Sequence, residues 1–154
     1  MSAPDATGQV EVAVPAESAY ALITDLDRFA AVTEEAVAME WTTGSSAAAG
    51  AVFRGRNRNG VRRWSTACTV VEAVPGTRFA FDVTSGGKIK VARWQYDIES
   101  TGPSSCRVIE STWDQRPAWF VKPAGLVTGV ADRKAGNSAN IEATLQRLKA
   151  ALEA

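Results

Sequence analysis

The spacing of apolar residues changes three times along the chain, and this feature limits the available folds more than any other. Apolar and polar residues alternate over residues 9–14, apolar residues recur at helical spacing over 16–26, alternation returns from 36 to about 116, and helical spacing returns over 124–153. Alternation with a period of two is typical of half-buried strands. Strands grouped between helical segments favour an α+β fold over one that alternates strand and helix.

The central alternating region divides into six strands at short turn signals. These strands are predicted at residues 36–43, 51–57, 62–74, 78–84, 90–99 and 106–115. The most specific turn signal is Asn59-Gly60, which predicts a type I′ hairpin because that turn needs positive φ at both central residues. The connections are short, so neighbouring strands should pair antiparallel, and with residues 9–14 they make seven strands.

Helices are predicted at both ends of this strand region. A helix begins at Ala16, with Glu17 favourably placed in its first turn, and a second short helix covers residues 29–32. One long amphipathic helix is predicted over residues 124–153, softened in its first half by glycines. A sheet with one apolar face must cover that face, and only this last helix is long enough to do so.

The charge balance and the composition exclude several classes of function. Lysine plus arginine and aspartate plus glutamate number 17 each, which leaves no net charge to attract nucleic acid. The chain has no histidine, so Ser-His triads and histidine-containing metal sites are excluded. Cys68 and Cys106 alone do not complete a tetrahedral metal site and are expected to be buried free thiols. We therefore predict no metal and no cofactor.

The chain shows no targeting or membrane-spanning signal. Its first residues lack the basic and apolar segments of a secretory signal, and no apolar stretch approaches the ~20 residues that span a bilayer. The expected protein is cytoplasmic, without integral membrane association, and residues 1–154 are expected to form one domain.

Several segments, in this order, resemble the START-like helix-grip superfamily (SRPBCC), and within it the polyketide cyclase/dehydrase family. They are VEVAVPAE at 10–17, YALITD at 20–25, VEAVPG at 71–76, RFAF at 78–81, RWQY at 93–96 and TLQRLKAALE at 144–153. The resemblance covers nearly the whole chain. It implies a seven-stranded curved antiparallel sheet wrapped around a long C-terminal helix, with a hydrophobic small molecule in the cavity between them. Where the family often has a tryptophan after the first helices, this chain has the segment 29–32, so its cavity entrance is expected to differ.

Strand alternation predicts which side chains face that cavity. On strand 90–99, the inward set must hold Trp94 and Tyr96, because the opposite face would bury Arg93, Gln95 and Asp97. The same reasoning on the other strands predicts inward residues Val37, Met39 and Trp41, then Phe53 and Gly55, then Trp64, Thr66, Cys68 and Val70, then Phe79, Phe81 and Val83.

The inward face of strand 106–115 stays open at this point. One choice is Val108, Glu110 and Thr112, and the other is Ile109, Ser111 and Trp113. In the first case, desolvation would raise the pKa of Glu110, which would make it the candidate acid or base of the site.

On the last helix, Val130 and Lys134 fall on the apolar side, where Lys134 either meets a ligand carboxylate or extends its amine to the edge. The predicted ligand-binding residues are thus Trp41, Phe53, Trp64, Phe81, Trp94, Tyr96, Glu110, Thr112, Val130 and Lys134.

Three functions are compatible with this pattern. The preferred prediction is a protein, monomeric or homodimeric, that binds an apolar or amphipathic small molecule such as a lipid or polyketide. The first alternative is a polyketide cyclase/dehydrase that acts mainly by ordering its substrate. The second alternative is a protein-interaction module of the chaperone-activator type, which would have a filled interior and an exposed apolar patch. An open cavity would therefore favour the binding protein or the cyclase, and a filled core would favour the interaction module.

Overall fold

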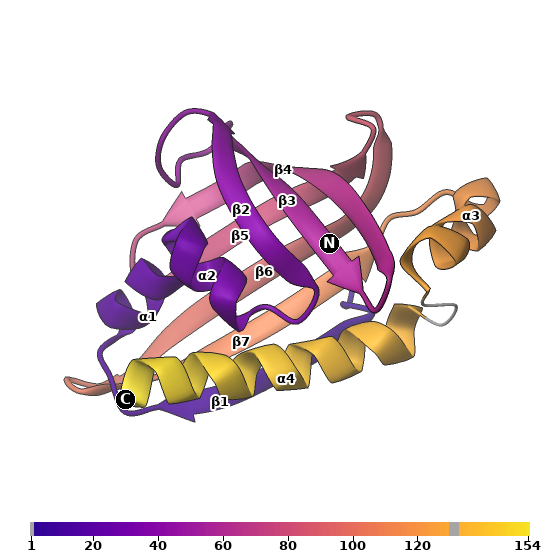
Figure 1. Cartoon of the computed structure of the whole chain (residues 1–154). Helices are drawn as coiled ribbons and strands as arrows, with labels where there is room; N and C mark the ends of the chain where they lie inside the picture. Colours follow the sequence, from indigo (N-terminus) through magenta and orange to yellow (C-terminus); the bar gives the residue numbers. More distant parts are fainter. Residues whose placement is uncertain (1, 130–132) are drawn as a thin grey trace.

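A computed structural model describes residues 2–129 and 133–154 (Figure 1). Its elements, in chain order, are β1 (Ala6–Val12), α1 (Ala16–Thr24), α2 (Leu26–Val32), β2 (Ala36–Thr43), β3 (Val52–Asn59), β4 (Arg62–Val74), β5 (Arg78–Ser85), β6 (Ile89–Gly102), β7 (Ser105–Asp114), α3 (Ala118–Thr128) and α4 (Arg133–Glu153). The seven strands form one antiparallel sheet in the order β1-β7-β6-β5-β4-β3-β2. The predicted meander is therefore confirmed, with β1 added beside the last strand.

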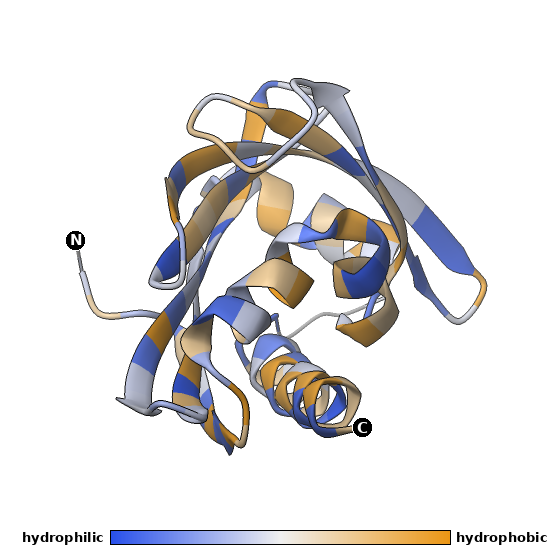
Figure 2. Ribbon diagram, turned by 90° about the vertical axis from the view of Figure 1, so that its left-hand side faces the viewer, coloured by the Kyte–Doolittle hydropathy of each residue, from blue (hydrophilic) through white to orange (hydrophobic). Residues whose placement is uncertain are grey.

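The sheet curves around α4, which lies across its concave side against β1 (Figure 2). The close approach of helix and strand depends on Gly8 in β1. A Cβ atom there would lie 2.8 Å from the Ile141 side chain of α4, closer than real Cβ contacts allow. Helices α1 and α2 cover a further part of the same concave side (Figure 1). This arrangement is the expected α+β helix-grip fold.

The first two helices follow the sequence closely. Ala19, Leu22 and Ile23 of α1 are fully buried, as their helical spacing predicts. Helix α2 begins at Leu26, three residues before its predicted start, because the Asp25 side chain caps it by accepting a hydrogen bond from the Arg28 backbone N–H at 3.5 Å.

The hairpin between β3 and β4 is present, but the predicted type I′ turn is wrong. Asn59 pairs with Arg62 in the ladder, so the two loop residues are Gly60 and Val61. Gly60 has a φ of 62°, whereas no other residue type in the described chain has positive φ. Positive φ at the first loop residue alone is the pattern of a type II′ turn. The Asn59 side-chain amide donates a hydrogen bond to the Thr128 carbonyl oxygen, at the end of α3, at 2.9 Å.

Two predicted details of the outer strands need correction. Strand β1 covers Ala6–Val12 and not 9–14, because its extent is set by pairing with β7. The last residue pair of this ladder is Val12 with Cys106. Val37 was predicted to face inward, yet it is 57% exposed. The pairing of β2 with β3 shifts between Ala36 and Ala38, so Val37 is the extra residue of a bulge and loses the alternation of its neighbours.

The predicted single helix over 124–153 is two helices. Helix α3 covers Ala118–Thr128 and is capped by Gly129, whose φ of 76° is the left-handed conformation that commonly follows a helix end. Helix α4 begins at Arg133. Figure 1 shows α3 standing beyond the end of α4, near the β3–β4 hairpin. The last helical segment therefore supplies both the helix that the sheet grips and a separate short helix.

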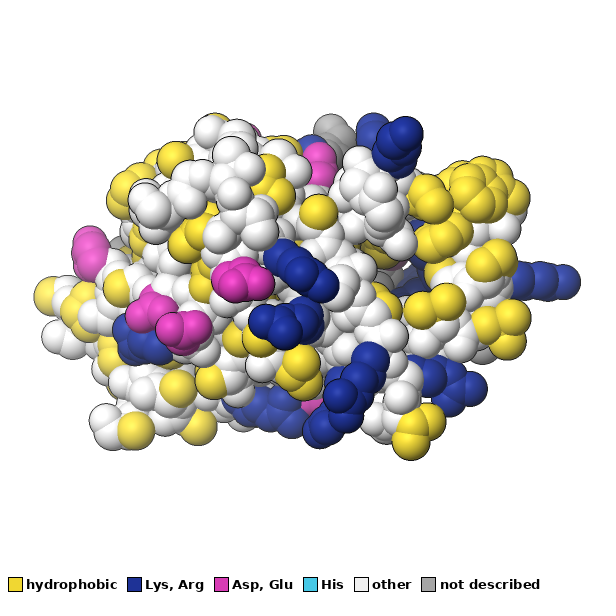
Figure 3. All heavy atoms as spheres, turned by 45° about the horizontal axis from the view of Figure 1, so that its top comes forward, with side chains coloured by type: hydrophobic (Ala, Val, Ile, Leu, Met, Phe, Trp, Pro, Cys, Tyr) yellow, Lys and Arg dark blue, Asp and Glu magenta, His cyan; other side chains and the backbone are white. Residues whose placement is uncertain are grey.

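Hydrophobic side chains gather on the surface at the α3 end of the molecule (Figure 3). They include Trp119, Leu126 and Val127 of α3 and Val61 of the neighbouring hairpin. Within the described residues, no helix has both the length and the apolar character needed to cross a bilayer.

Candidate functional site

A cavity of about 300 Å³ lies between the concave face of the sheet and helices α2, α3 and α4. Strands β2 to β7 all contribute side chains to its wall, and most of that wall is apolar. Such a concave, mainly apolar space with a few polar groups is the usual composition of a small-molecule site. The interior is therefore hollow, unlike the filled interior expected of the interaction module.

Aromatic rings form the inner wall. Phe29 of α2 contacts Phe81 and Tyr96 edge-to-face, with ring centroids 6.2 and 5.3 Å apart, and Phe53 contacts Phe81 at 5.1 Å. Edge-to-face packing of this kind fixes ring orientation as well as burying area. The wall is thus a packed surface that keeps its shape beside the open space.

The inner end of the cavity holds a buried pair of polar side chains, Tyr96 and Glu110. They face each other across β6 and β7, and each is 2% exposed. The Tyr96 hydroxyl donates a hydrogen bond of 2.6 Å to Glu110 Oε2, while Glu110 Oε1 has no partner. This settles the open question of the last strand, since Val108, Glu110 and Thr112 are the inward set.

The surroundings of Glu110 keep its carboxyl group protonated. Burial raises its pKa from 4.5 to about 8, more than the Tyr96 hydrogen bond lowers it. Burial, reinforced by the neighbouring Glu110, also raises the pKa of Tyr96 well above 10. At neutral pH both groups are therefore mainly protonated, and the pair can donate a proton or a hydrogen bond.

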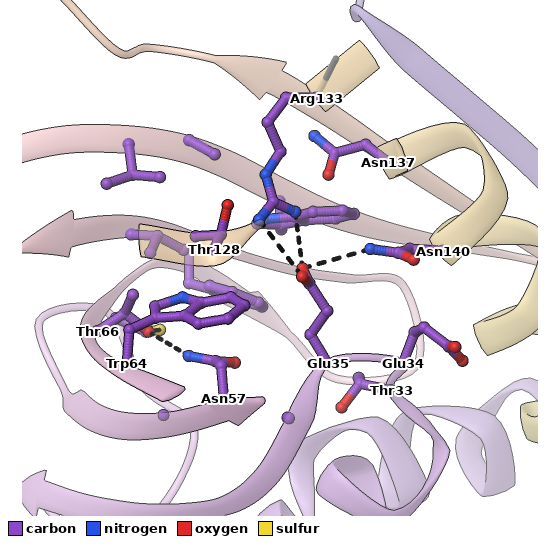
Figure 4. A pocket seen from close by; sticks show the side chains of 18 of the residues that line it. Thr33, Glu34, Glu35, Asn57, Trp64, Thr66, Thr128, Arg133, Asn137 and Asn140 are labelled. Atoms are coloured by element: carbon purple, nitrogen blue, oxygen red, sulfur yellow. Dashed lines mark hydrogen bonds and ion pairs between the residues drawn. The ribbon is translucent and has the colours of Figure 1, made fainter. Parts of the chain in front are cut away.

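The mouth of the cavity has a different polar cluster, drawn in Figure 4. Arg133, at the start of α4, binds Glu35 with two hydrogen bonds of 2.7 and 3.3 Å, and Asn140 donates to the same carboxylate at 3.3 Å. The guanidinium also lies 5.9 Å from the ring centroid of Trp64. The mouth of the cavity is therefore bordered by an ion pair whose arginine lies over the ring of Trp64.

A second ion pair lines the cavity at the end of β7. Arg116 binds the Asp114 carboxylate at 2.7 Å. Burial acts to raise the pKa of Asp114, but the hydrogen bonds from Arg116 outweigh it and lower the pKa. Each of the two arginines that line the cavity thus already has a carboxylate partner.

Cys68 also lines the cavity, but burial raises the pKa of its thiol to about 12. Such a thiol is a poor nucleophile. Both cysteines are buried and free, as predicted. Among the described residues, no group of three or more histidine, cysteine, aspartate or glutamate side chains is placed to hold a metal ion.

The structure brings most of the predicted site residues together. Six of the ten line the cavity: Phe53, Trp64, Phe81, Trp94, Tyr96 and Glu110. Trp41 instead packs edge-to-face behind Phe53 at 5.6 Å. Thr112 is buried but turns its hydroxyl to the Arg93 carbonyl at 2.9 Å, so it serves the sheet. Val130 lies outside the described residues.

Lys134 was placed on the wrong side of the helix, because its side chain is exposed to solvent. The prediction counted one continuous helix and set its apolar face by Val130 and Ile141, of which Val130 lies outside the described residues. With α4 beginning at Arg133, the face toward the cavity carries Arg133, Asn137, Asn140 and Thr144.

The sequence prediction therefore left out Arg133, Asn140 and Thr144, whereas Asn137 lies on nearly the same helical stripe as Lys134, and a signal for all four was present. Arg133, Asn137, Asn140 and Thr144 recur at intervals of four, three and four residues, which is helical spacing of polar groups on one face. Glu35 carries no such signal, because it lies between α2 and β2 and meets Arg133 only in the fold.

Known structures with this fold include three that show its range. A polyketide-cyclase-like protein from Corynebacterium glutamicum is 24% identical, with a TM-score of 0.63, over 96% of this chain and 90% of that one. A conserved protein from Geobacillus kaustophilus is 13% identical, with a TM-score of 0.69, over 95% and 93% of the two chains. The di-domain ARO/CYC protein of the steffimycin biosynthetic pathway is 16% identical, with a TM-score of 0.66, over 95% of this chain and 51% of that one.

No curated protein matches the sequence. These three solved structures are each below 25% identity and so support the fold alone. The family comparison is more specific, since the family described as polyketide cyclase / dehydrase and lipid transport matches residues 3–153. The chain, with its curved sheet, gripped helix and hollow interior, belongs to that polyketide cyclase/dehydrase and lipid transport family.

Proposed function

We propose that this protein binds an apolar or amphipathic small molecule, lipid-like or polyketide-like, in the cavity between sheet and α4. The observation that carries the proposal is the cavity itself, about 300 Å³ with an aromatic wall, one buried polar pair and a charged mouth. The family match supports it, because the family description includes both polyketide cyclisation and lipid transport.

The wall residues proposed to contact the ligand are Phe53, Trp64, Phe81, Trp94, Tyr96 and Glu110, together with Phe29 and Asn137. Trp94 offers the most direct probe, because its indole lines the cavity. Trp113 provides a matched control on the neighbouring strand. It is not among the lining residues, and its indole N–H donates to the Ser2 carbonyl at 2.8 Å.

The test is binding of a neutral fluorescent hydrocarbon-like probe, N-phenyl-1-naphthylamine, together with native mass spectrometry of the purified protein. We expect a co-purified small molecule or saturable probe binding, weakened about tenfold by Trp94→Ala and little changed by Trp113→Ala. Saturable binding that is equal in both variants would place the probe elsewhere on the protein. No co-purified molecule and no saturable binding would overturn the proposal.

A second candidate function is cyclisation or dehydration of a polyketide chain, held in a reactive shape by the wall. The Tyr96–Glu110 pair favours it, because a carboxyl with a raised pKa is a suitable proton donor to an enolising ketone. Glu110→Gln keeps the shape but removes the proton. If the protein is an enzyme, this variant should lose turnover of a poly-β-ketone substrate while still binding it.

The remaining expectations form part of the same proposal. Two buried free thiols fit a reducing, cytoplasmic compartment. The balanced charge favours a small-molecule partner over nucleic acid. We propose that residues 1–154 act as one START-like domain, as a monomer or homodimer, which size-exclusion chromatography with light scattering would test.

A further inference from the structure

The hydrogen bonds at the inner end of the cavity leave one oxygen without a partner. Glu110 Oε2 accepts from the Tyr96 hydroxyl, and Glu110 Oε1, on a residue that lines the cavity, bonds nothing. Buried polar atoms in folded proteins are nearly always hydrogen-bonded. A single unpaired oxygen on a cavity wall therefore marks the place where a ligand supplies the missing partner.

The arrangement also determines which atom of Glu110 carries the proton. Because Oε2 receives the Tyr96 hydrogen, the carboxyl proton belongs on Oε1, the unpaired atom. Burial keeps this carboxyl protonated, with a pKa of about 8. The inner end thus presents an O–H donor, and the complementary ligand group is an oxygen acceptor.

The charges around the cavity show what kind of oxygen fits. Among the described lining residues, the cations are Arg116 and Arg133, and both are engaged, by Asp114 and Glu35 respectively. The titratable group in contact with Glu110 is Tyr96, which is itself protonated. A ligand carboxylate at this point would be a buried anion without a counter-ion, which is strongly unfavourable.

The second polar region of the cavity is distant from this point. Arg133 begins α4, whereas Glu110 pairs with Gly8 of β1, which packs against Ile141 of α4. Eight residues of helix separate Arg133 from Ile141, about 12 Å at 1.5 Å per residue. A ligand that reaches the inner end therefore leaves its other end near the Arg133–Glu35 pair (Figure 4).

We propose that the cavity selects an uncharged ligand that enters with a ketone, aldehyde or hydroxyl oxygen foremost, bound by the O–H of Glu110, and that it rejects a free carboxylate at that end. This inference rests on the proposed small-molecule binding and makes it more specific. It assigns Glu110 a role in specificity whether or not a reaction follows.

The test uses three probes of one shape: 2-acetylnaphthalene, 2-isopropylnaphthalene and 2-naphthoate. Their dissociation constants are measured by calorimetry at pH 6.5 for the wild type, Glu110→Leu, Glu110→Gln and the surface control Glu40→Leu. The informative quantity is the preference for the ketone over the hydrocarbon, compared between proteins. This comparison cancels the cost of removing the ketone from water.

We expect the ketone preference to be about tenfold greater in the wild type than in Glu110→Leu, because that variant lacks the donor. Glu110→Gln, whose amide still donates, should keep most of the preference, and Glu40→Leu should keep all of it. At pH 9.5, where Glu110 is ionised, the wild-type preference should fall about threefold or more. 2-Naphthoate should bind the wild type most weakly of the three probes.

The possible outcomes distinguish failure of this inference from failure of the proposed small-molecule binding. If 2-isopropylnaphthalene binds but the ketone preference is the same in the wild type and in Glu110→Leu, the cavity remains a binding site and the inference is wrong. The same holds if 2-naphthoate binds the wild type as tightly as the ketone. If none of the three probes binds, the proposed small-molecule function fails and this inference fails with it.

Discussion

Each end of the cavity has a carboxyl group beside an apolar space, but the two carboxyl groups are accommodated in opposite ways. At the inner end, Glu110 is 2% exposed, bonds one tyrosine and holds its proton because burial raises its pKa to about 8. At the mouth, Glu35 is matched by two hydrogen bonds from Arg133 and a third from Asn140. One end holds a carboxyl that burial keeps neutral, and the other holds an ion pair.

The packing around the two ends differs in the same sense. The inner end is enclosed by the rings of Phe29, Phe53 and Phe81. The mouth adjoins α3, whose Trp119 is 67% exposed. The free energy of folding therefore depends mainly on the inner end, whereas the mouth can change at small cost to the fold. Each prediction below tests this contrast.

The largest effect is expected from truncating an aromatic ring at each end. Phe29→Ala removes a fully buried ring that contacts Phe79, Phe81 and Tyr96, and it should lower the free energy of unfolding by about 3–5 kcal/mol. Trp119→Ala removes a mostly exposed ring and should cost less than about 1 kcal/mol. Urea unfolding followed by circular dichroism measures both values. Equal losses would show that the two ends contribute alike.

The pH dependence of stability should come next in size. Between pH 4.5 and about 8, the folded state keeps a proton on Glu110 that the unfolded state releases, so the wild type should lose stability as pH rises through this range. At about 1.4 kcal/mol for each pKa unit, and with the carboxyl half-protonated at each end of this range, the loss is on the order of 4 kcal/mol. Glu110→Gln should remove this loss and be the more stable protein at pH 8.

The corresponding change at the mouth should have the opposite sign. Glu35→Gln leaves Arg133 without its charged partner, so it should destabilise the protein at pH 8. Chemical unfolding of the three proteins at pH 5 and pH 8 gives the comparison. A wild type whose stability relative to Glu110→Gln does not change with pH would contradict a neutral inner end.

A smaller effect is expected from removing the cation of the mouth. The side chains of Arg133 and Glu35 are 13% and 21% exposed, so their ion pair is partly desolvated, and Arg133→Ala should cost about 1–2 kcal/mol. The control is Arg56→Ala, which breaks a 3.8 Å pair with Glu40 on the open surface and should cost under about 0.5 kcal/mol. A double-mutant cycle with Glu35→Ala isolates the energy of the pair.

The smallest predicted effect concerns the end of α3. Gly129 has a φ of 76°, and a Cβ atom there would meet the Arg62 side chain at 2.7 Å. Gly129→Ala should therefore cost about 1 kcal/mol. The faster amide hydrogen exchange it causes should be confined to α3 and should leave Phe29 and Glu110 protected. Loss of protection at the inner end would show that the two ends are coupled.

The sequence predicted the apolar wall better than the polar groups. Trp94 and Tyr96 follow from the alternation of one strand, because the other face of that strand would bury several polar and charged groups. Glu110 could not be assigned in the same way, since both faces of β7 carry polar residues. Its position was decided by pairing with β1 and β6, which sets the register of the whole strand.

The helical end of the chain shows the limit of periodicity more clearly. Helical spacing continues through residues 124–153, so it predicted one helix with Lys134 on its apolar side. The left-handed Gly129 ends α3, and the docking of α4 on β1 at Gly8 then fixes which face of α4 meets the cavity. Rotation of a helix about its own axis depends on what it packs against, and the sequence of the helix alone does not contain that information.

By itself, the sequence determined the number and direction of the strands, the strand–helix order and the aromatic character of the interior. These depend on local spacing and on the cost of burying polar groups, which each segment carries within itself. Only the tertiary structure decided that a hollow remains, that Glu110 is neutral beside Tyr96, and that Arg133 meets Glu35. Those properties arise where segments distant in sequence exclude water from one another, and burial of that kind exists only once the chain has folded.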